Sequence, residues 1–334
     1  MTDNSFSHLS ISTPLRVSLL GGGADFSHYI SKKARYIFGM AINKYIHFNA
    51  YKMPEVVPKT HRFQYSKTEE FSDLNCILHP VIKAVLNYEK PTKFLNVAIA
   101  SDLPGGSGLG SSSAFTCGLI HLVREVNQHS HNPNLLAYRT IEIEQKILKE
   151  NVGIQDQLFA ALGNVQLFRL LPSHYEQIAL GVNLEILFNE LECTSFLVFT
   201  NLLRSSHKVQ EHTSSNFINN NYIEQISNIS EVFYDKLFST NSPIELLAEC
   251  VNDSWEIKSK FSLGQHFDYI NDIIDKTRKG GSRFSKLLGA GHGGFIYCSV
   301  PVAKQDNFFK KLEDYIIIKV KPSPYGSICN SYYL

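Results

Sequence analysis

The order of hydrophobic and polar positions divides the first half of the chain into strand-like and helix-like stretches. Stretches rich in β-branched and aromatic residues predict strands at 12–20, 37–52 and 94–104. Stretches whose apolar residues recur at steps of three and four predict helices at 72–88, 111–128 and 134–150. The first half therefore predicts strands and helices that pack together in one mixed domain.

After about residue 165 the pattern changes to shorter strand-like pieces among longer helical ones. Strands are expected at 165–171 and 194–200, and helices at 205–228 (with a mobile approach), 245–261 and 266–281. The chain closes with FSKLLGAGHGGFIYCSV, a helical stretch and DYIIIKVKPSP. This order predicts an α+β protein of two domains joined near residues 165–195, which we divide into residues 1–180 and 181–334.

Composition and charge exclude several classes of protein. Of the 334 residues 43% are apolar, which is typical of a folded globular chain, and 32 Lys and Arg nearly balance 31 Asp and Glu. This balance argues against nucleic acid or an anionic membrane as a partner. The sequence has no apolar run of about 20 residues and no secretory signal, and its six cysteines form no CxxC pair. We therefore expect a cytoplasmic protein with reduced thiols.

The stretch DLPGGSGLGSSS (102–113) joins an expected strand to an expected helix. Unpaired amides and the positive end of the helix dipole make an anion site there without a lysine. Glycines allow close approach and positive φ, and a serine hydroxyl can ligate Mg²⁺ between phosphates. The alternative is a flexible turn with a serine N-cap. The expected phosphate-binding residues are Pro104, Gly105, Gly106, Ser107, Gly108, Leu109, Gly110, Ser111, Ser112 and Ser113.

Two other stretches carry candidate chemistry. In LRVSLLGGGADF a strand bearing Arg16 ends in three glycines, with Asp25 just after them. In EIEQKILKENVGIQDQ a helical Glu144 is followed twelve positions later by Asp156, after a glycine-bearing turn. Taken singly, each has a structural explanation, such as a glycine turn or a solvated helix carboxylate.

The stretch KLLGAGHGGF matches GxGxxG at Gly289, Gly291 and Gly294. Dinucleotide binding needs a strand before this motif and a helix after it, whereas here a helical segment precedes and the strand FIYCSV follows. Because the helix and the strand come in the opposite order here, the motif is not a dinucleotide-binding loop. A zinc enzyme is also disfavoured, because the histidines at 129–131 lie in a polar loop with no Cys pair nearby.

Taken together, the Arg-strand-glycine-Asp opening, the PxxxGLGSSS loop, the GxQDQ element and the late GAGxGG loop resemble the GHMP small-molecule kinases. The four elements span residues 14–295. The resemblance implies a two-domain fold, with an N-terminal domain like domain 2 of ribosomal protein S5 and a ferredoxin-like C-terminal domain. Within the family, TPLRVSLLGGGADF is most similar to the D-glycero-D-manno-heptose 7-phosphate kinases, since a galactokinase has Glu-His in place of Gly22 and Gly23. His292 departs from the usual glycine.

The resemblance also implies roles in an ATP-dependent transfer to a sugar hydroxyl. Asp156 is the expected base, Arg16 stabilises the carboxylate and the transferring phosphoryl group, and Mg²⁺ lies between Ser112 (less favoured, Ser111) and Glu144. The sugar is expected to contact Gly22, Gly23, Asp25, Asp156, Arg204, Gly291 and Gly293. The glycines of the late loop allow close packing on the substrate or the nucleotide loop. Arg204 with Lys208, or Lys44, are candidates for a sugar phosphate.

By resemblance the substrate is a heptose 7-phosphate, phosphorylated at C1 to the 1,7-bisphosphate for nucleotide-activated heptose synthesis. Alternatives are a fucokinase- or galactokinase-like 1-kinase of an unphosphorylated sugar, and a non-catalytic relative that binds sugar and ATP. The only expected partner is the small-molecule sugar phosphate. Neither a nucleic acid nor a membrane is expected as a partner. The sequence leaves the oligomeric state open.

Overall fold

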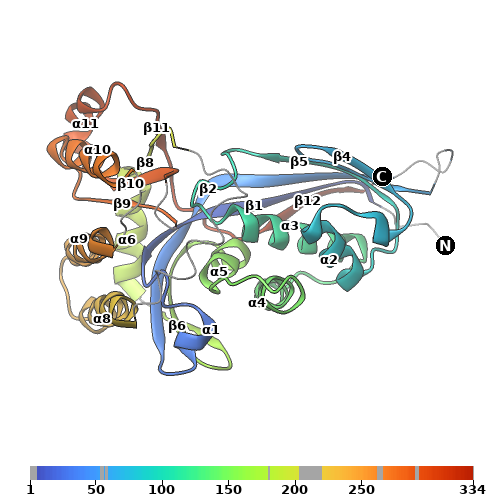
Figure 1. The fold of residues 1–334 in the computed structure, drawn as a ribbon, viewed down its shortest axis with the longest axis horizontal. Helices are drawn as coiled ribbons and strands as arrows, with labels where there is room; N and C mark the ends of the chain where they lie inside the picture. The colour runs from blue at the N-terminus through green and yellow to red at the C-terminus, as the bar shows by residue number, and fades with distance from the viewer. Residues whose placement is uncertain are drawn as a thin grey trace.

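The computed structural model describes residues 6–52, 56, 59–179, 181–202, 220–261, 266–289 and 293–333. Figure 1 shows an elongated sheet with helices on one side, and a group of helices and short strands at one end of it. The two parts correspond to two β-sheets, one of eight strands and one of four. The expected mixture of strands and helices in both halves of the chain is confirmed.

The larger sheet is built around two long N-terminal strands. Its strands run in the order β12-β1-β2-β5-β3-β4, and β6 pairs with both β2 and β7. The strands are β1 (Phe6–Leu20), β2 (Arg35–Lys52), β3 (His61–Gln64), β4 (Thr68–Phe71), β5 (Leu95–Ser101), β6 (Val165–Leu170), β7 (Tyr175–Gln177) and β12 (Ile328–Tyr333). Neighbouring strands are antiparallel except β3 and β5. Because β12 pairs with β1, the end of the chain lies with the N-terminal strands.

Helices cover one face of this sheet (Figure 1). They are α2 (Pro80–Glu89), α3 (Ser111–Val126), α4 (Pro133–Glu142) and α5 (Gln155–Leu162), with the short α1 (Ser27–Ile30), a 3-10 turn (Leu74–Cys76) and a π-helical turn (Ile143–Ile147). Residues such as Phe48 of β2, Leu119 of α3 and Phe159 of α5 are fully buried between the layers. Burial of this apolar surface is the main force that holds helices and sheet together.

The smaller sheet has the order β11-β8-β10-β9 and is antiparallel throughout. Its strands are β8 (Ser195–Phe199), β9 (Phe284–Leu287), β10 (Phe295–Ser299) and β11 (Ile317–Lys319). The helices around it are α6 (Gly181–Thr194), α8 (Asn220–Leu237), α9 (Pro243–Phe261), α10 (Phe267–Lys279) and α11 (Gln305–Lys311), with a 3-10 turn at Val302–Lys304. Phe196, Trp255 and Ile296 belong to its buried core.

An ion pair connects the two parts of the molecule. The fully buried guanidinium of Arg35, on β2, donates to both carboxylate oxygens of Glu224, on α8, at 3.0 and 2.6 Å. A paired fork of this kind satisfies a buried cation and fixes the angle between the two elements. Within the described residues, no helix is both long and apolar enough to span a bilayer.

Four sequence expectations need correction. The helix expected at 205–228 is α8, which runs from Asn220 to Leu237, and positions 205–219 lie outside the described residues. The helix expected at 72–88 begins only at Pro80, which suits the first helical position because it lacks an amide hydrogen. The helix expected at 134–150 gives way at residue 143 to the π-helical turn. The late glycine loop is preceded directly by strand β9, not by a helix. Because strand β10 follows that loop, the exclusion of dinucleotide binding holds.

Candidate active site

Arg16 and Asp156 form a two-pronged ion pair at the centre of the candidate site. Arg16 lies on β1 and Asp156 in the first turn of α5. Arg16 donates from Nε to Asp156 Oδ1 at 2.6 Å and from Nη2 to Oδ2 at 2.5 Å. The Arg16 side chain is 8% exposed and that of Asp156 is 25% exposed. The carboxylate is therefore fixed in orientation but accessible to a ligand.

The glycine-rich loop lies directly against this ion pair. Arg16 Nη1 donates to the carbonyl of Gly108 at 2.6 Å, and its backbone amide donates to the carbonyl of Leu109 at 3.0 Å. A Cβ on Gly110 would come within 3.2 Å of Asp156 Oδ2. The fold thus brings together the loop, the arginine and the carboxylate.

The loop ends in a glycine cap rather than the expected serine cap. Gly110 is the N-cap of α3 at φ 71°, and the cap position makes no side-chain hydrogen bond. Ser111, Ser112 and Ser113 lie inside the first turn. Gly106 and Gly108 also adopt positive φ, at 70° and 81°, as expected. Without a side chain over its end, the helix leaves its first amides available to an anion.

The late glycine loop packs on the first one. A Cβ on Gly289 would lie 2.7 Å from Gly108 Cα, and one on Gly294 would lie 2.3 Å from the carbonyl oxygen of Ser107. No side chain fits at either contact, which confirms the expected close packing of the two loops. Gly293 lies against Leu202 instead. Gly291 and His292 fall outside the described residues, as do Arg204 and Lys208.

Glu144 is a buried carboxylate on the π-helical turn, which places it beside the start of α3. Its Oε2 accepts hydrogen bonds from Ser113 Oγ at 2.9 Å and from Gln157 Nε2 at 2.5 Å. Its Oε1 is buried without a hydrogen-bond partner. Burial raises the pKa of Glu144 to about 7. An unsatisfied buried carboxylate oxygen beside serine hydroxyls fits a Mg²⁺ ligand.

Of the three serines, Ser113 contacts Glu144, whereas Ser112 is exposed. The assignment of Ser112 as a metal ligand therefore stays a prediction.

Asp25 holds the turn that carries Asp156. It is 2% exposed, and its two oxygens accept from the amides of Gly23 at 3.0 Å and Gln155 at 3.1 Å. A Cβ at position 153 would come 1.8 Å from Asp25 Oδ2, so only glycine fits before the catalytic turn. Burial and the charge of Asp156 raise the pKa of Asp25. Its expected contact with a sugar stays a prediction beside this positioning role.

The neighbourhood of Gly22 and Gly23 is also tied to the turn. Ser18 Oγ donates to Gln155 Oε1 at 2.8 Å, and a Cβ on Gly22 would lie 2.9 Å from the same Ser18 hydroxyl. Gly23 has φ 95°. The three-glycine segment therefore passes close to the GxQDQ turn, as the opening motif suggested.

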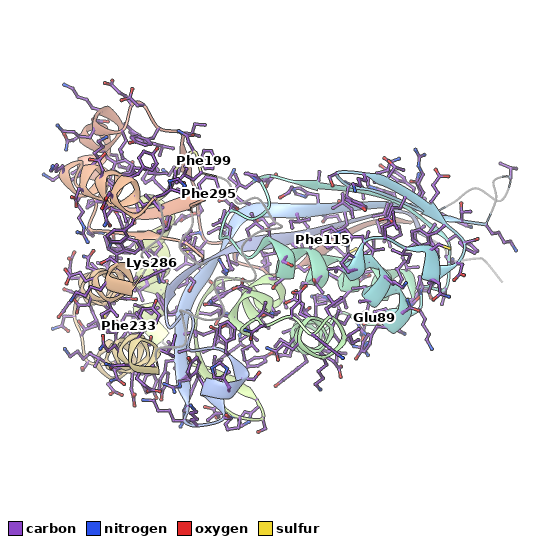
Figure 2. The ribbon with its side chains drawn as sticks, in the orientation of Figure 1. Glu89, Phe115, Phe199, Phe233, Lys286 and Phe295 are labelled. Carbon is purple, nitrogen blue, oxygen red and sulfur yellow. The ribbon has the colours of Figure 1, made fainter. Side chains whose placement is uncertain are left out.

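Sequence reasoning missed two lysines beside the late loop. Lys286, on β9, is buried and donates to the carbonyl of Leu19 at 2.7 Å. Burial, with the charges of Lys258 and Arg16, lowers the pKa of Lys286 to about 7. Lys258, on α9, donates to the carbonyls of Leu287 at 3.2 Å and Gly289 at 2.6 Å. Figure 2 shows Lys286 where the two parts of the molecule meet. The available signal was that Lys286 precedes the late glycine motif in KLLGAGHGGF.

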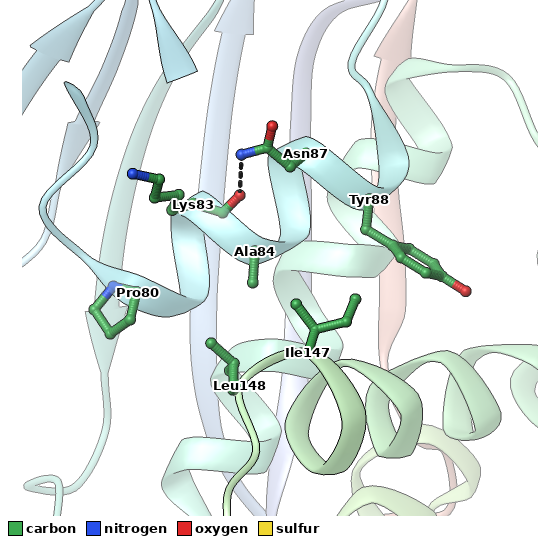
Figure 3. A pocket seen from close by; sticks show the side chains of 7 residues that line it. All are labelled: Pro80, Lys83, Ala84, Asn87, Tyr88, Ile147 and Leu148. Atoms are coloured by element: carbon green, nitrogen blue, oxygen red, sulfur yellow. Dashed lines mark hydrogen bonds between the residues drawn. The ribbon is translucent and has the colours of Figure 1, made fainter. Parts of the chain in front are cut away.

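Two further features are a lysine that was a candidate for the sugar phosphate and a hollow on the surface. Lys44 is half-buried on β2. A shallow hollow between α2 and the π-helical turn is lined by Pro80, Lys83, Ala84, Asn87, Tyr88, Ile147 and Leu148 (Figure 3). Its one cation, Lys83, donates to the carbonyl of Asn75 at 2.9 Å. The hollow contains none of the expected site residues.

Comparisons with known proteins identify relatives of this chain. The family model described as GHMP kinases N terminal domain matches residues 75–164, which include the first glycine loop, Glu144 and Asp156. A D-glycero-alpha-D-manno-heptose 7-phosphate kinase from Campylobacter jejuni is 28% identical over 317 residues, 90% of this chain and 91% of that protein. A galactokinase from Pyrococcus furiosus is 20% identical over 317 residues, 86% of this chain and 88% of that protein.

Solved structures share the fold. The D-glycero-D-manno-heptose 1-phosphate kinase from Bacteroides thetaiotaomicron matches with a TM-score of 0.76 at 19% identity, over 98% of this chain and 100% of that chain. The resemblance drawn from the four motifs is confirmed, and so is the two-domain fold that it implied.

Proposed function

Because this chain carries a GHMP kinase N-terminal domain, we propose that it transfers the γ-phosphoryl group of ATP to a hydroxyl of a sugar. The observation that carries the proposal is the Arg16–Asp156 pair, held against a glycine-rich loop at the start of a helix. Phosphoryl transfer needs positioning, charge neutralisation and an acceptor for the proton of the attacking hydroxyl. The site has a group for each need.

Asp156 is the proposed base. Its carboxylate is fixed by Arg16 and remains partly exposed, so a sugar hydroxyl can approach it and give up its proton as the new bond to phosphorus forms. Arg16 is close enough to the loop to stabilise negative charge on the transferring group, because its third nitrogen already contacts Gly108. Asp25 positions the turn and does not itself have to react.

The loop from Pro104 to Ser113 is proposed to bind the phosphates of ATP, with the amide hydrogens coming from the residues after Pro104. Glu144 with Ser112 is proposed to hold Mg²⁺. The metal would neutralise phosphate charge. The free Oε1 of Glu144 supports its share of this role. Lys258 adds positive charge beside the late glycine loop, which partly replaces the lysine that the first loop lacks.

For the acceptor we propose the anomeric hydroxyl of a heptose 7-phosphate, which gives the 1,7-bisphosphate. The 28% identical relative named as a heptose 7-phosphate kinase supports this choice. The galactokinase relative supports the alternative, a 1-kinase for an unphosphorylated sugar. A non-catalytic protein is less well supported, because Arg16, Glu144 and Asp156 are all present and Arg16 and Asp156 are paired.

The substrate is tested by measuring ADP release with Mg²⁺ and ATP over a panel of acceptors. The panel contains heptose 7-phosphate, free heptose, galactose and fucose, and phosphorus NMR locates the new phosphate. We expect turnover with the heptose 7-phosphate and a phosphate at C1. Preference for a free sugar would support the alternative kinase, and no turnover with any sugar would support a binding protein.

Asp156→Asn tests the catalytic assignment. Loss of the base is expected to lower kcat by about 10²–10⁴-fold, while sugar and ATP binding measured by calorimetry persist. The exposed Asp306, at the start of α11, is a matched control, and Asp306→Asn is expected to leave kcat unchanged. Near-normal turnover of Asp156→Asn would contradict the role of Asp156.

A further inference from the structure

A second group of chemically active side chains lies at the far end of α3. His121 and Glu125 are four residues apart on this helix, so they project from one face, and His131 follows in the loop to α4. One ligand atom from each of the three lies within 4.8 Å of the others, and this is the one such group of histidine, cysteine and carboxylate ligands in the described part of the chain. His121 is about 15 Å along the helix axis from the serines at its start.

His121 is a buried histidine whose two ring nitrogens face different side chains. It is 2% exposed, and its Nδ1 lies 2.8 Å from Ser327 Oγ, which in turn lies 2.8 Å from Thr13 Oγ1. If the Ser327 hydroxyl donates to Thr13, it accepts from Nδ1–H, and the lone pair of His121 is then on Nε2. That atom is buried and makes no hydrogen bond of good geometry, although Glu125 Oε1 is 3.3 Å away. The buried Nε2 therefore faces a carboxylate oxygen at 3.3 Å rather than a well-aligned hydrogen-bond partner.

The loop after α3 returns His131 to the helix. Gln128 adopts φ 55°, and the amide of His129 donates to the carbonyl of Arg124 at 2.9 Å. On the other side, Asn132 caps α4 by accepting from the amide of Leu135 at 3.0 Å. The rings of His121 and His131 are stacked with centroids 4.3 Å apart. Both ends of the loop are therefore fixed where the exposed His131 ring meets the buried one.

We propose that His121, Glu125 and His131 bind one Zn²⁺, as a structural site separate from the catalytic one. Two imidazoles and a carboxylate are a ligand set that zinc accepts, with water in the fourth position. Tetrahedral bonds of about 2.0–2.1 Å place ligand atoms roughly 3.3 Å apart. The His121–Glu125 separation of 3.3 Å already has this value. The exposed ring of His131, stacked on that of His121, would turn to bring a nitrogen to the metal.

The neighbouring groups are compatible with a cation. In the tautomer with a hydrogen on Nδ1, Ser327 accepts that hydrogen and fixes the orientation of the ring, as a metal-bound histidine requires. Arg124, whose charge acts on Glu125 and His131, is turned to the carbonyl of Ser130 at 3.4 Å and to Glu89 at 3.9 Å. Bound zinc would join the end of α3, the approach to α4 and the segment before β12. Stabilisation rather than catalysis is the expected result.

The test uses the full chain without a histidine tag, with excess Mg²⁺ present to occupy the proposed oxygen-ligand site. Zinc affinity is measured by competition with a chromophoric chelator, and the zinc-dependent rise in Tm is measured in parallel. Wild type is expected to bind one Zn²⁺ and to melt at a higher temperature with it. His131→Ala and Glu125→Gln are expected to weaken binding at least tenfold and to lose the rise in Tm.

His129→Ala is the matched control, because His129 is an exposed histidine of the same loop and is not part of the group. It is expected to bind zinc like wild type. Equal zinc affinity in wild type, His131→Ala and Glu125→Gln would overturn the proposal and indicate binding at exposed thiols such as Cys76. Since both substituted positions are partly or fully exposed, the variants are expected to fold, and a normal Tm without zinc verifies this.

Discussion

Among single residues, Glu144 has an environment that links protonation to metal binding. Its pKa is raised to about 7 by burial, against an ordinary value of 4.5, so the folded protein favours the neutral acid. The stability that this group contributes is therefore complete below about pH 4.5 and is lost as the pH rises through 7. A bound Mg²⁺ would replace the proton, because it needs the carboxylate.

It follows that Mg²⁺ should stabilise the protein more at pH 8 than at pH 6. We expect the rise in Tm caused by Mg²⁺ to grow over this range in wild type, and to be nearly absent in Glu144→Gln at both pH values. Differential scanning fluorimetry with and without Mg²⁺ measures this. An equal Mg²⁺ effect at the two pH values would separate Glu144 from the metal.

At the scale of elements, the active site depends on two glycine loops that pack backbone to backbone. Gly294 has φ 98°, and a Cβ there would lie 2.3 Å from the carbonyl oxygen of Ser107. Gly294→Ala must therefore push the loops apart. We expect a cost of about 1–3 kcal/mol in the free energy of unfolding and at least a tenfold rise in KM for ATP. Chemical denaturation and steady-state kinetics measure the two effects.

Gly181→Ala is the control for Gly294→Ala, because it adds a Cβ at a positive φ without a steric clash. Gly181 also has positive φ, at 53°, but a Cβ there would meet no atom within 4 Å. The variant is expected to keep the wild-type KM for ATP and to lose little stability. If Gly181→Ala raised KM as much as Gly294→Ala, the contact between the loops would not explain the effect.

At the scale of the whole molecule, Lys286 joins the two sheets. It lies on β9 of the smaller sheet and donates to Leu19 of β1 in the larger one. Its pKa is lowered to about 7 by burial, while the unfolded chain keeps a value near 10.5. Between these values the unfolded state binds more protons, so this residue makes the protein more stable as the pH rises from 7 towards 10.

We therefore expect the stability of Lys286→Met to depend less on pH than that of wild type. From pH 7 to 9 the unfolding midpoint in denaturant should rise less in Lys286→Met than in wild type, because the variant lacks the buried amine. Lys310→Met, at an exposed position of α11, should follow the wild-type slope. Parallel curves for wild type and Lys286→Met would show that Lys286 is charged at all these pH values in the folded protein.

Local patterns predicted most strands and helices, because periodicity and glycine content act over a few residues. The patterns were less accurate where a turn sets the first residue of a helix, as at Pro80. They were also less accurate where a short strand such as β9 closely follows a helix. The serine cap was wrong for a similar reason, since Gly110 in the left-handed region leaves the serines inside the helix.

The sequence by itself determined the four motifs, and with them the resemblance to the GHMP kinases and the candidates Arg16, Glu144 and Asp156. Only the tertiary structure decided that Arg16 pairs with a residue 140 positions away, that Ser113 contacts Glu144, and that Lys286 reaches β1. It also placed His131 beside His121 across the end of a helix. The physical reason is that a motif records the conformation of its own few residues, whereas distances between motifs depend on how sheets and helices pack.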